Sequence, residues 1–142
     1  MKKCIFITLL LALLLTGFAA SADTRYYLLQ MIPPLGEQSR TYYLTLNLGE
    51  RDANNVTEIT GSYAQKLYMD GQQRLYNAGD VEGRIEGDDI TLYLQQSAFS
   101  HYLMIKATFV DMNFDLLEGE WQQSSCFSFS TGSAIGTEVD GF

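Results

Sequence analysis

The stretch Val81–Leu94, VEGRIEGDDITLYL, decides the fold class. Before Gly87, apolar or small residues alternate with charged ones, and after Asp89 aliphatic residues alternate with polar ones. Period-two alternation on both sides of a Gly/Asp turn predicts an antiparallel β-hairpin with one buried and one exposed face. Its first arm has the order apolar–polar–Gly–polar–apolar. The same order recurs at Ile59–Tyr63 and Leu117–Trp121, which indicates a single sheet built by repeating hairpins.

Similar alternating segments fill the chain between these arms. Strands are predicted over Arg25–Ile32, Arg40–Leu48 and His101–Val110, with a tight hairpin turn at Asp70-Gly71 and a further turn at Asn77–Asp80. The predicted domain shows no convincing helical periodicity. Eight or nine short strands in this order predict an all-β, antiparallel, up-and-down meander. A small closed 8-stranded barrel is the first expectation, because closure removes the exposed strand edges. A two-layer sandwich is the second.

Glycine at the centre of each repeated arm favours closure, since glycine lets a strand bend where a barrel wall turns. In strand count, meander order and Gly-x-aromatic arms, the layout resembles the lipocalin and avidin style of barrel in outline. This resemblance implies the fold alone, and it carries over no binding residues.

The first 22 residues are predicted to be a cleaved secretory signal peptide. Lys2 and Lys3 precede the apolar run Ile5–Leu15, and the small residues Ala20–Ala22 follow it. The run is too short for a stable membrane span. Phe18 stands where a bacterial lipoprotein would carry its lipidated cysteine, so no lipid anchor is expected. The sequence therefore predicts a bacterial protein that is periplasmic or secreted and has no stable membrane anchor.

The remainder is predicted to form one barrel domain over residues 23–130 and a loose C-terminal tail over residues 131–142, because the tail is small, polar and rich in glycine. The chain has nine basic and 17 acidic residues. Without Lys2 and Lys3, seven basic residues face 17 acidic ones, which is a net charge of −10. This balance argues against nucleic acid and against anionic membrane surfaces as partners.

The sequence predicts no enzyme, no catalytic residue, no metal site and no cofactor. His101 is the sole histidine, and no spacing joins it to Cys126 as a nucleophile and base. Asp111–Asp115 has the D-x-N-x-D spacing of a calcium loop. It continues with Leu116 in place of the sharp-turn glycine and with Gln122 in place of the final glutamate. An ordinary turn is therefore expected there.

Nine tyrosines and one tryptophan point to binding, because these side chains combine large apolar area with a polar tip. The first functional hypothesis is a non-enzymatic binding protein that holds a small apolar or aromatic ligand inside the barrel or at its mouth. The predicted ligand-binding residues are Trp121, Tyr63, Tyr42 and Tyr26.

The alternative is a protein-binding envelope module, such as an inhibitor of a secreted enzyme or an immunity protein. Glu82, Glu86, Glu118 and Glu120 take the exposed parity of their arms. If these arms are neighbours, the glutamates form an acidic wall for a basic protein partner. Cys126 is expected to be buried, and a third hypothesis makes it the cross-link of a structural subunit. The oligomeric state and the identity of any ligand stay open.

Overall fold

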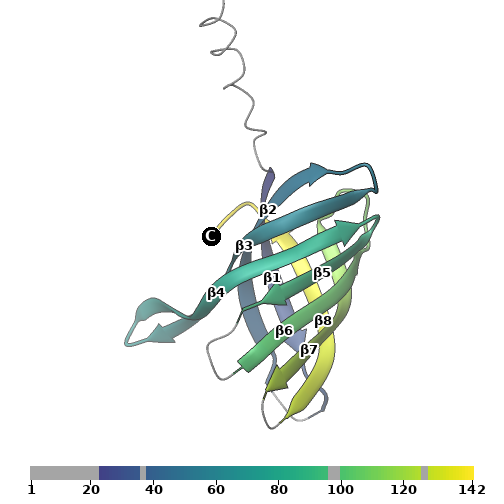
Figure 1. Ribbon diagram of the computed structural model, residues 1–142. Helices are drawn as coiled ribbons and strands as arrows, with labels where there is room; N and C mark the ends of the chain where they lie inside the picture. Colours follow the sequence, from purple (N-terminus) through teal and green to yellow (C-terminus); the bar gives the residue numbers. More distant parts are fainter. Residues whose placement is uncertain (1–22, 36–37, 96–99, 126–127) are drawn as a thin grey trace, which may run out of the picture.

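The computed structural model describes residues 23–35, 38–95, 100–125 and 128–142 as a closed barrel of antiparallel strands. Figure 1 shows the strands following one another around the wall in chain order. The strands are β1 (Asp23–Ile32), β2 (Arg40–Arg51), β3 (Val56–Met69), β4 (Gln72–Glu86), β5 (Asp89–Leu94), β6 (Ser100–Phe109), β7 (Leu116–Ser125) and β8 (Phe129–Val139). The predicted 8-stranded up-and-down barrel is confirmed. In the described ranges no helix is long and apolar enough to cross a membrane.

The hairpin that decided the fold class forms as predicted. Ile85 pairs with Ile90 and Glu86 with Asp89, around a turn in which Gly87 has a positive φ of 65°. The inward side chains of these two strands are buried, and the alternating charged residues are mostly exposed. A single hydrophobic core fills the barrel, built from the inward parity of all eight strands.

The central glycines of the three repeated arms bring neighbouring strands close together. A Cβ atom placed on Gly61, Gly83 or Gly119 would collide with a backbone carbonyl oxygen of the adjacent strand. Close packing of the wall therefore requires glycine at these positions. This is consistent with the role in barrel closure that was expected from the sequence.

The prediction of a loose tail from Thr131 onward is wrong for most of its length. Phe129–Val139 is β8, which pairs with β7 on one side and with β1 on the other and so closes the barrel. Its inward positions are Gly132, Ala134 and Gly136, and large neighbours occupy the space that larger side chains would need. A strand with such small inward residues lacks the hydrophobic alternation that identifies strands in a sequence.

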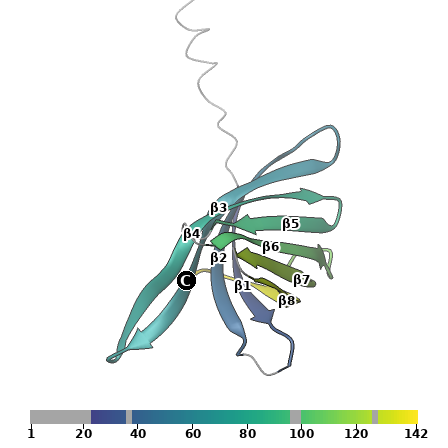
Figure 2. The same ribbon diagram turned by 60° about the horizontal axis from the view of Figure 1, so that its bottom comes forward.

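The predicted turn at Asn77–Asp80 is also wrong, because these residues belong to β4. The pairing of β3 with β4 shifts register between Tyr63 and Gln65, and Asn77 takes a positive φ of 48° inside the irregularity. Turn-forming residues therefore mark a bulge here. Beyond it, Gln65–Met69 and Gln72–Tyr76 continue as a two-stranded ribbon that Figures 1 and 2 show projecting from the barrel.

The predicted signal peptide, residues 1–22, and Cys126 lie outside the described residues. The structure therefore does not test the cleavage site, the cellular location or the fate of the thiol.

Candidate functional site

The barrel has two unlike ends. We call the end at which β1 begins and β6 runs into β7 the cavity end, and the end that holds Trp121 the closed end. An indentation of about 200 Å³ opens at the cavity end. Its apolar walls come from six residues on β2, β4, β5, β6 and the β6–β7 loop: Leu46, Leu48, Ile85, Ile90, Phe109 and Phe114.

The β6–β7 loop brings Phe114 to the edge of this cavity. Its ring makes an edge-to-face contact with Phe109, with ring centroids 4.6 Å apart. Its backbone carbonyl accepts a hydrogen bond of 2.8 Å from the buried Tyr27 hydroxyl. Phe114 has a positive φ of 64°, which is rare for a bulky residue and indicates that the surrounding contacts impose this conformation.

The carboxylate of Asp111 organises the same loop as a turn residue. It accepts a hydrogen bond of 2.8 Å from the backbone N–H of Asp115. The carbonyl of Asp115 in turn accepts one of 2.8 Å from the backbone N–H of Glu138 on β8. The Asp111 side chain thus holds the loop by bonding its backbone. In the part of the chain that the structure describes, no group of three or more His, Cys, Asp and Glu residues is placed to hold a metal ion.

Arg25 ties the rim of the cavity together. Its Nε lies 3.1 Å from an oxygen of Asp23, and its Nη1 lies 3.4 Å from an oxygen of Glu138. Nη1 also donates to the carbonyl of Asn113 at 3.0 Å, and the guanidinium lies 5.8 Å from the ring centroid of Phe114. One cation therefore connects β1, β8 and the β6–β7 loop.

Burial and nearby charges shift the pKa values of this network. Burial, together with the negative charge of Glu138, raises the pKa of Tyr27 to about 12, although Arg25 acts in the opposite direction. Burial also raises the pKa of Glu138, against the attraction of Arg25. Burial works to lower the pKa of Arg25, but its hydrogen bond to Asp23 and the charge of Glu138 contribute to a net rise. The rim therefore favours a neutral Tyr27 and a charged Arg25.

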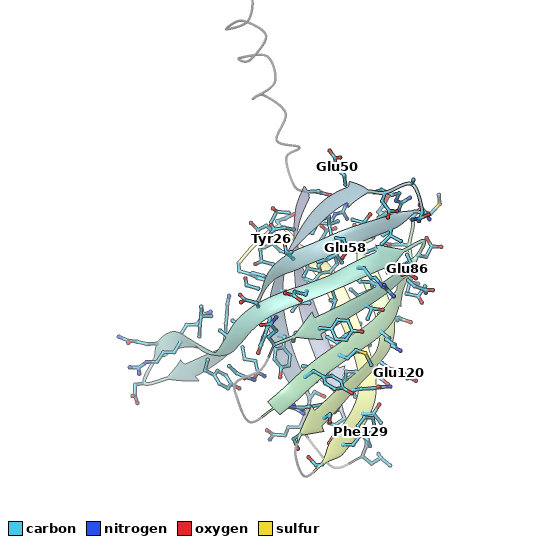
Figure 3. All side chains as sticks on the ribbon, in the orientation of Figure 1. Tyr26, Glu50, Glu58, Glu86, Glu120 and Phe129 are labelled. Atoms are coloured by element: carbon cyan, nitrogen blue, oxygen red, sulfur yellow. The ribbon has the colours of Figure 1, made fainter. Side chains whose placement is uncertain are left out.

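None of the four predicted ligand-binding residues lines this cavity. Trp121, Tyr42 and Tyr63 are fully buried in the core, with exposed fractions of 0%, 0% and 2%. The rings of Tyr42 and Tyr63 meet at 5.8 Å, and the Trp121 indole N–H donates to the carbonyl of Ile32 at 3.3 Å. Tyr26 is labelled on the outer face in Figure 3, where its ring contacts Phe142. Their ligand-binding role stays a prediction.

The predicted acidic wall does not form as one surface. Glu82 and Glu86 lie on β4, and Glu118 and Glu120 lie on β7, with β5 and β6 between these strands. Lys106 on β6 stands directly opposite Glu120 in the pairing of β6 with β7. The condition for an acidic wall, that these arms are neighbours, is therefore not met, because the meander places two strands between them. Binding of a basic partner by these residues stays a prediction.

Sequence reasoning did not single out Glu58 on β3, an exposed residue that is the register partner of Arg84. Arg84 itself pairs with Glu86, with Nε and Oε1 2.9 Å apart. It also missed the polar rim of the cavity: Asp23, Arg25, Arg51 and Thr57. Three of these residues are charged and lie at or near strand ends, which in a sequence look like ordinary solvent-exposed positions.

A larger depression of about 830 Å³ lies outside the barrel at the base of the ribbon, where Tyr43, Lys66, Leu75 and Phe142 contribute to its lining. The ammonium of Lys66 lies 4.1 Å from the ring centroid of Tyr43 and 5.3 Å from that of Phe142. This depression is open to solvent and mixed in polarity, whereas the cavity at the barrel end is smaller and mainly apolar. The cavity is therefore the better candidate for a small-molecule site.

Comparisons of the chain with protein-family models, with curated proteins and with solved structures return no match.

Proposed function

We propose that this is a non-enzymatic binding protein, periplasmic or secreted, that holds one small apolar or aromatic molecule in the cavity at the cavity end of the barrel. The observation that carries the proposal is an apolar indentation of about 200 Å³ at the mouth of an otherwise packed barrel. An apolar cavity of roughly 150 Å³ is enough to bind benzene in a protein core. A single substituted aromatic ring or a short acyl chain matches this size.

The surroundings of the cavity support binding of a molecule with an apolar body. Leu48 and Phe114 are partly buried and offer apolar surface to a ligand, and the buried core lies behind them. Each square ångström of apolar ligand surface that they cover contributes roughly 25 cal/mol. The charged residues of the lining lie at or near strand ends, where they can orient one end of the ligand.

Isothermal titration calorimetry with a panel of single-ring aromatic compounds and short acyl compounds tests this proposal. Saturable one-to-one binding is expected, and the ligand should be recovered chemically unchanged. Leu48→Phe adds volume at a half-buried lining position and should abolish or strongly weaken binding. The matched control is Leu75→Phe on the exposed ribbon, which should bind as the wild type does.

Trp121 gives this experiment a second readout. It is the sole tryptophan, it is absent from the cavity lining, and it belongs to the opposite end of the barrel. Binding in the cavity should leave its fluorescence nearly unchanged. A large change in the fluorescence of Trp121 that survives Leu48→Phe would contradict the proposed site and favour the closed end. The absence of binding across the whole panel would contradict the proposed function.

A further inference from the structure

A bulge in β2 decides which charged side chain faces the cavity. Leu48 pairs with Ile59, but the next pair in the register is Arg51 with Thr57, so Gly49 and Glu50 together face Glu58. In a regular ladder the partner of Thr57 would be Glu50. The one extra residue shifts the parity of the strand and places an arginine where a glutamate would otherwise stand.

Thr57 has the inward parity of β3 and is buried, with 7% of its surface exposed. Residues directly opposite each other in an antiparallel pair have side chains on the same face of the sheet. Arg51 therefore shares the inward face with Thr57, and both residues line the cavity. Register partners that carry a guanidinium and a hydroxyl thus both line the apolar site.

The charge of Arg51 is available to a ligand. Among the described residues, Arg25 and Arg84 form salt bridges and Arg51 forms none. Asp23 is the one carboxylate in the described cavity lining, and it is engaged by Arg25. The carboxylate of Asp52, the next residue, accepts hydrogen bonds from the backbone N–H groups of Asn54 and Val56 within its own turn.

We propose that the ligand is a monocarboxylate with a small apolar body, and that Arg51 and Thr57 bind its carboxylate. This inference rests on the proposed function and names the ligand class for the same site. A carboxylate has two acceptor oxygens, which suits the planar fork of a guanidinium, while the Thr57 hydroxyl supplies one further donor. The apolar body then fills the cavity behind it, between β2, β4 and β5.

The test compares two ligands of the same shape that differ in charge, phenylacetate and phenylacetamide, by isothermal titration calorimetry at neutral pH and low salt. The wild type should bind phenylacetate about three- to tenfold more tightly, a range set by a charge-assisted hydrogen bond at a partly exposed site. Arg51→Gln should remove this preference, because it takes away the charge that distinguishes the two ligands. Arg51 is exposed, so this substitution is expected to leave the fold intact.

The matched control is Arg84→Gln, which removes an exposed arginine of the outer wall and should keep the preference for phenylacetate. Equal affinity of the wild type for the two ligands, or a preference that persists in Arg51→Gln, would overturn this inference and leave binding in the cavity intact. If neither ligand nor any uncharged compound of the wider panel binds, the proposed function fails as well. The two failures are thus distinguishable.

Discussion

The two ends of the barrel differ in how their inward side chains pack. At the closed end, large aromatic side chains face glycines across the ladder: Trp121 pairs with Gly132, and Tyr63 pairs with Gly79. A Cβ atom on Gly132 would lie 2.6 Å from the Trp121 indole nitrogen, and one on Gly79 would lie 2.9 Å from the Tyr63 ring. The missing glycine side chains make room for these rings, which fill this part of the described core.

The polar tips of these rings are satisfied by the backbone. The Tyr63 hydroxyl donates to the carbonyl of Gln95 at 2.7 Å, and the Trp121 indole donates to that of Ile32. At the cavity end the inward positions are mainly aliphatic, and the closing group is Phe114 on a loop. The described residues of the closed end are therefore tightly packed, while the cavity end keeps space and an unpaired guanidinium at some cost in packing.

Truncation of the closed end should have the largest effect. Trp121→Ala is expected to lower the free energy of unfolding by about 3–5 kcal/mol, because it removes a fully buried indole and leaves a cavity in the core. Urea denaturation followed by circular dichroism measures this change. The control is Tyr93→Ala on the outer wall, where 45% of the side chain is exposed and a much smaller loss is expected. A loss below about 1 kcal/mol for Trp121→Ala would remove the distinction between the two ends.

Substitution of Phe114 at the cavity end should cost less. Phe114→Ala removes the ring contact with Phe109 and is expected to lower stability by about 1–2 kcal/mol. Phe114→Gly removes the same ring but suits the positive φ, so it should be more stable than the alanine variant by about 1 kcal/mol. Thermal unfolding of the two variants side by side measures this difference. Equal stability of the two would show that the loop does not keep this backbone conformation.

The smallest effect concerns Tyr27 and depends on pH. At neutral pH, Tyr27→Phe loses the hydrogen bond to the carbonyl of Phe114 and should cost about 1 kcal/mol. The pKa of Tyr27 is raised from its ordinary value of 10 to about 12. Neutral Tyr27 therefore makes its full contribution to the stability of the fold below pH 10. That contribution is lost as the pH rises through 12.

The phenylalanine variant lacks this titration, so the stability gap between wild type and Tyr27→Phe should narrow above pH 10. Urea denaturation at about pH 8 and about pH 11 tests the direction of this change. Tyr93→Phe, which removes an exposed tyrosine, is the control for general alkaline effects. A gap that widens with pH would contradict the assigned environment of Tyr27.

The architecture could be predicted because most strands carry the information locally. Val81–Leu94 alternates clearly, and its turn contains Gly87, whose conformation the turn requires. β8 could not be predicted in this way, because its inward residues are small for a reason that lies elsewhere in the chain, in the size of Trp121 and Leu117. A turn was wrongly predicted at Asn77–Asp80, where β4 has a bulge, because bulges and turns favour the same residue types.

The candidate site was less accessible to sequence reasoning than the fold. The aromatic residues predicted to contact a ligand are of a type that binding sites use, but aromatic residues also fill cores. Which role each one takes depends on the size of its register partner on the neighbouring strand. The ladder pairs Tyr63 with Gly79 and Trp121 with Gly132. Arg51 was missed because an unbroken alternation places it on the outside, and one extra residue in β2 reverses that assignment.

The sequence by itself determined the fold class of this protein, because hydrophobic alternation and turn residues act over a few neighbouring positions. Tertiary structure alone decided at which end of the barrel the described cavity lies, how the four glutamates are separated and which charge faces the cavity. Each of these depends on register and strand order, which join residues such as Arg51 and Thr57, or Trp121 and Gly132, across the sheet. Such pairings arise when the whole chain closes on itself, and no local pattern records them.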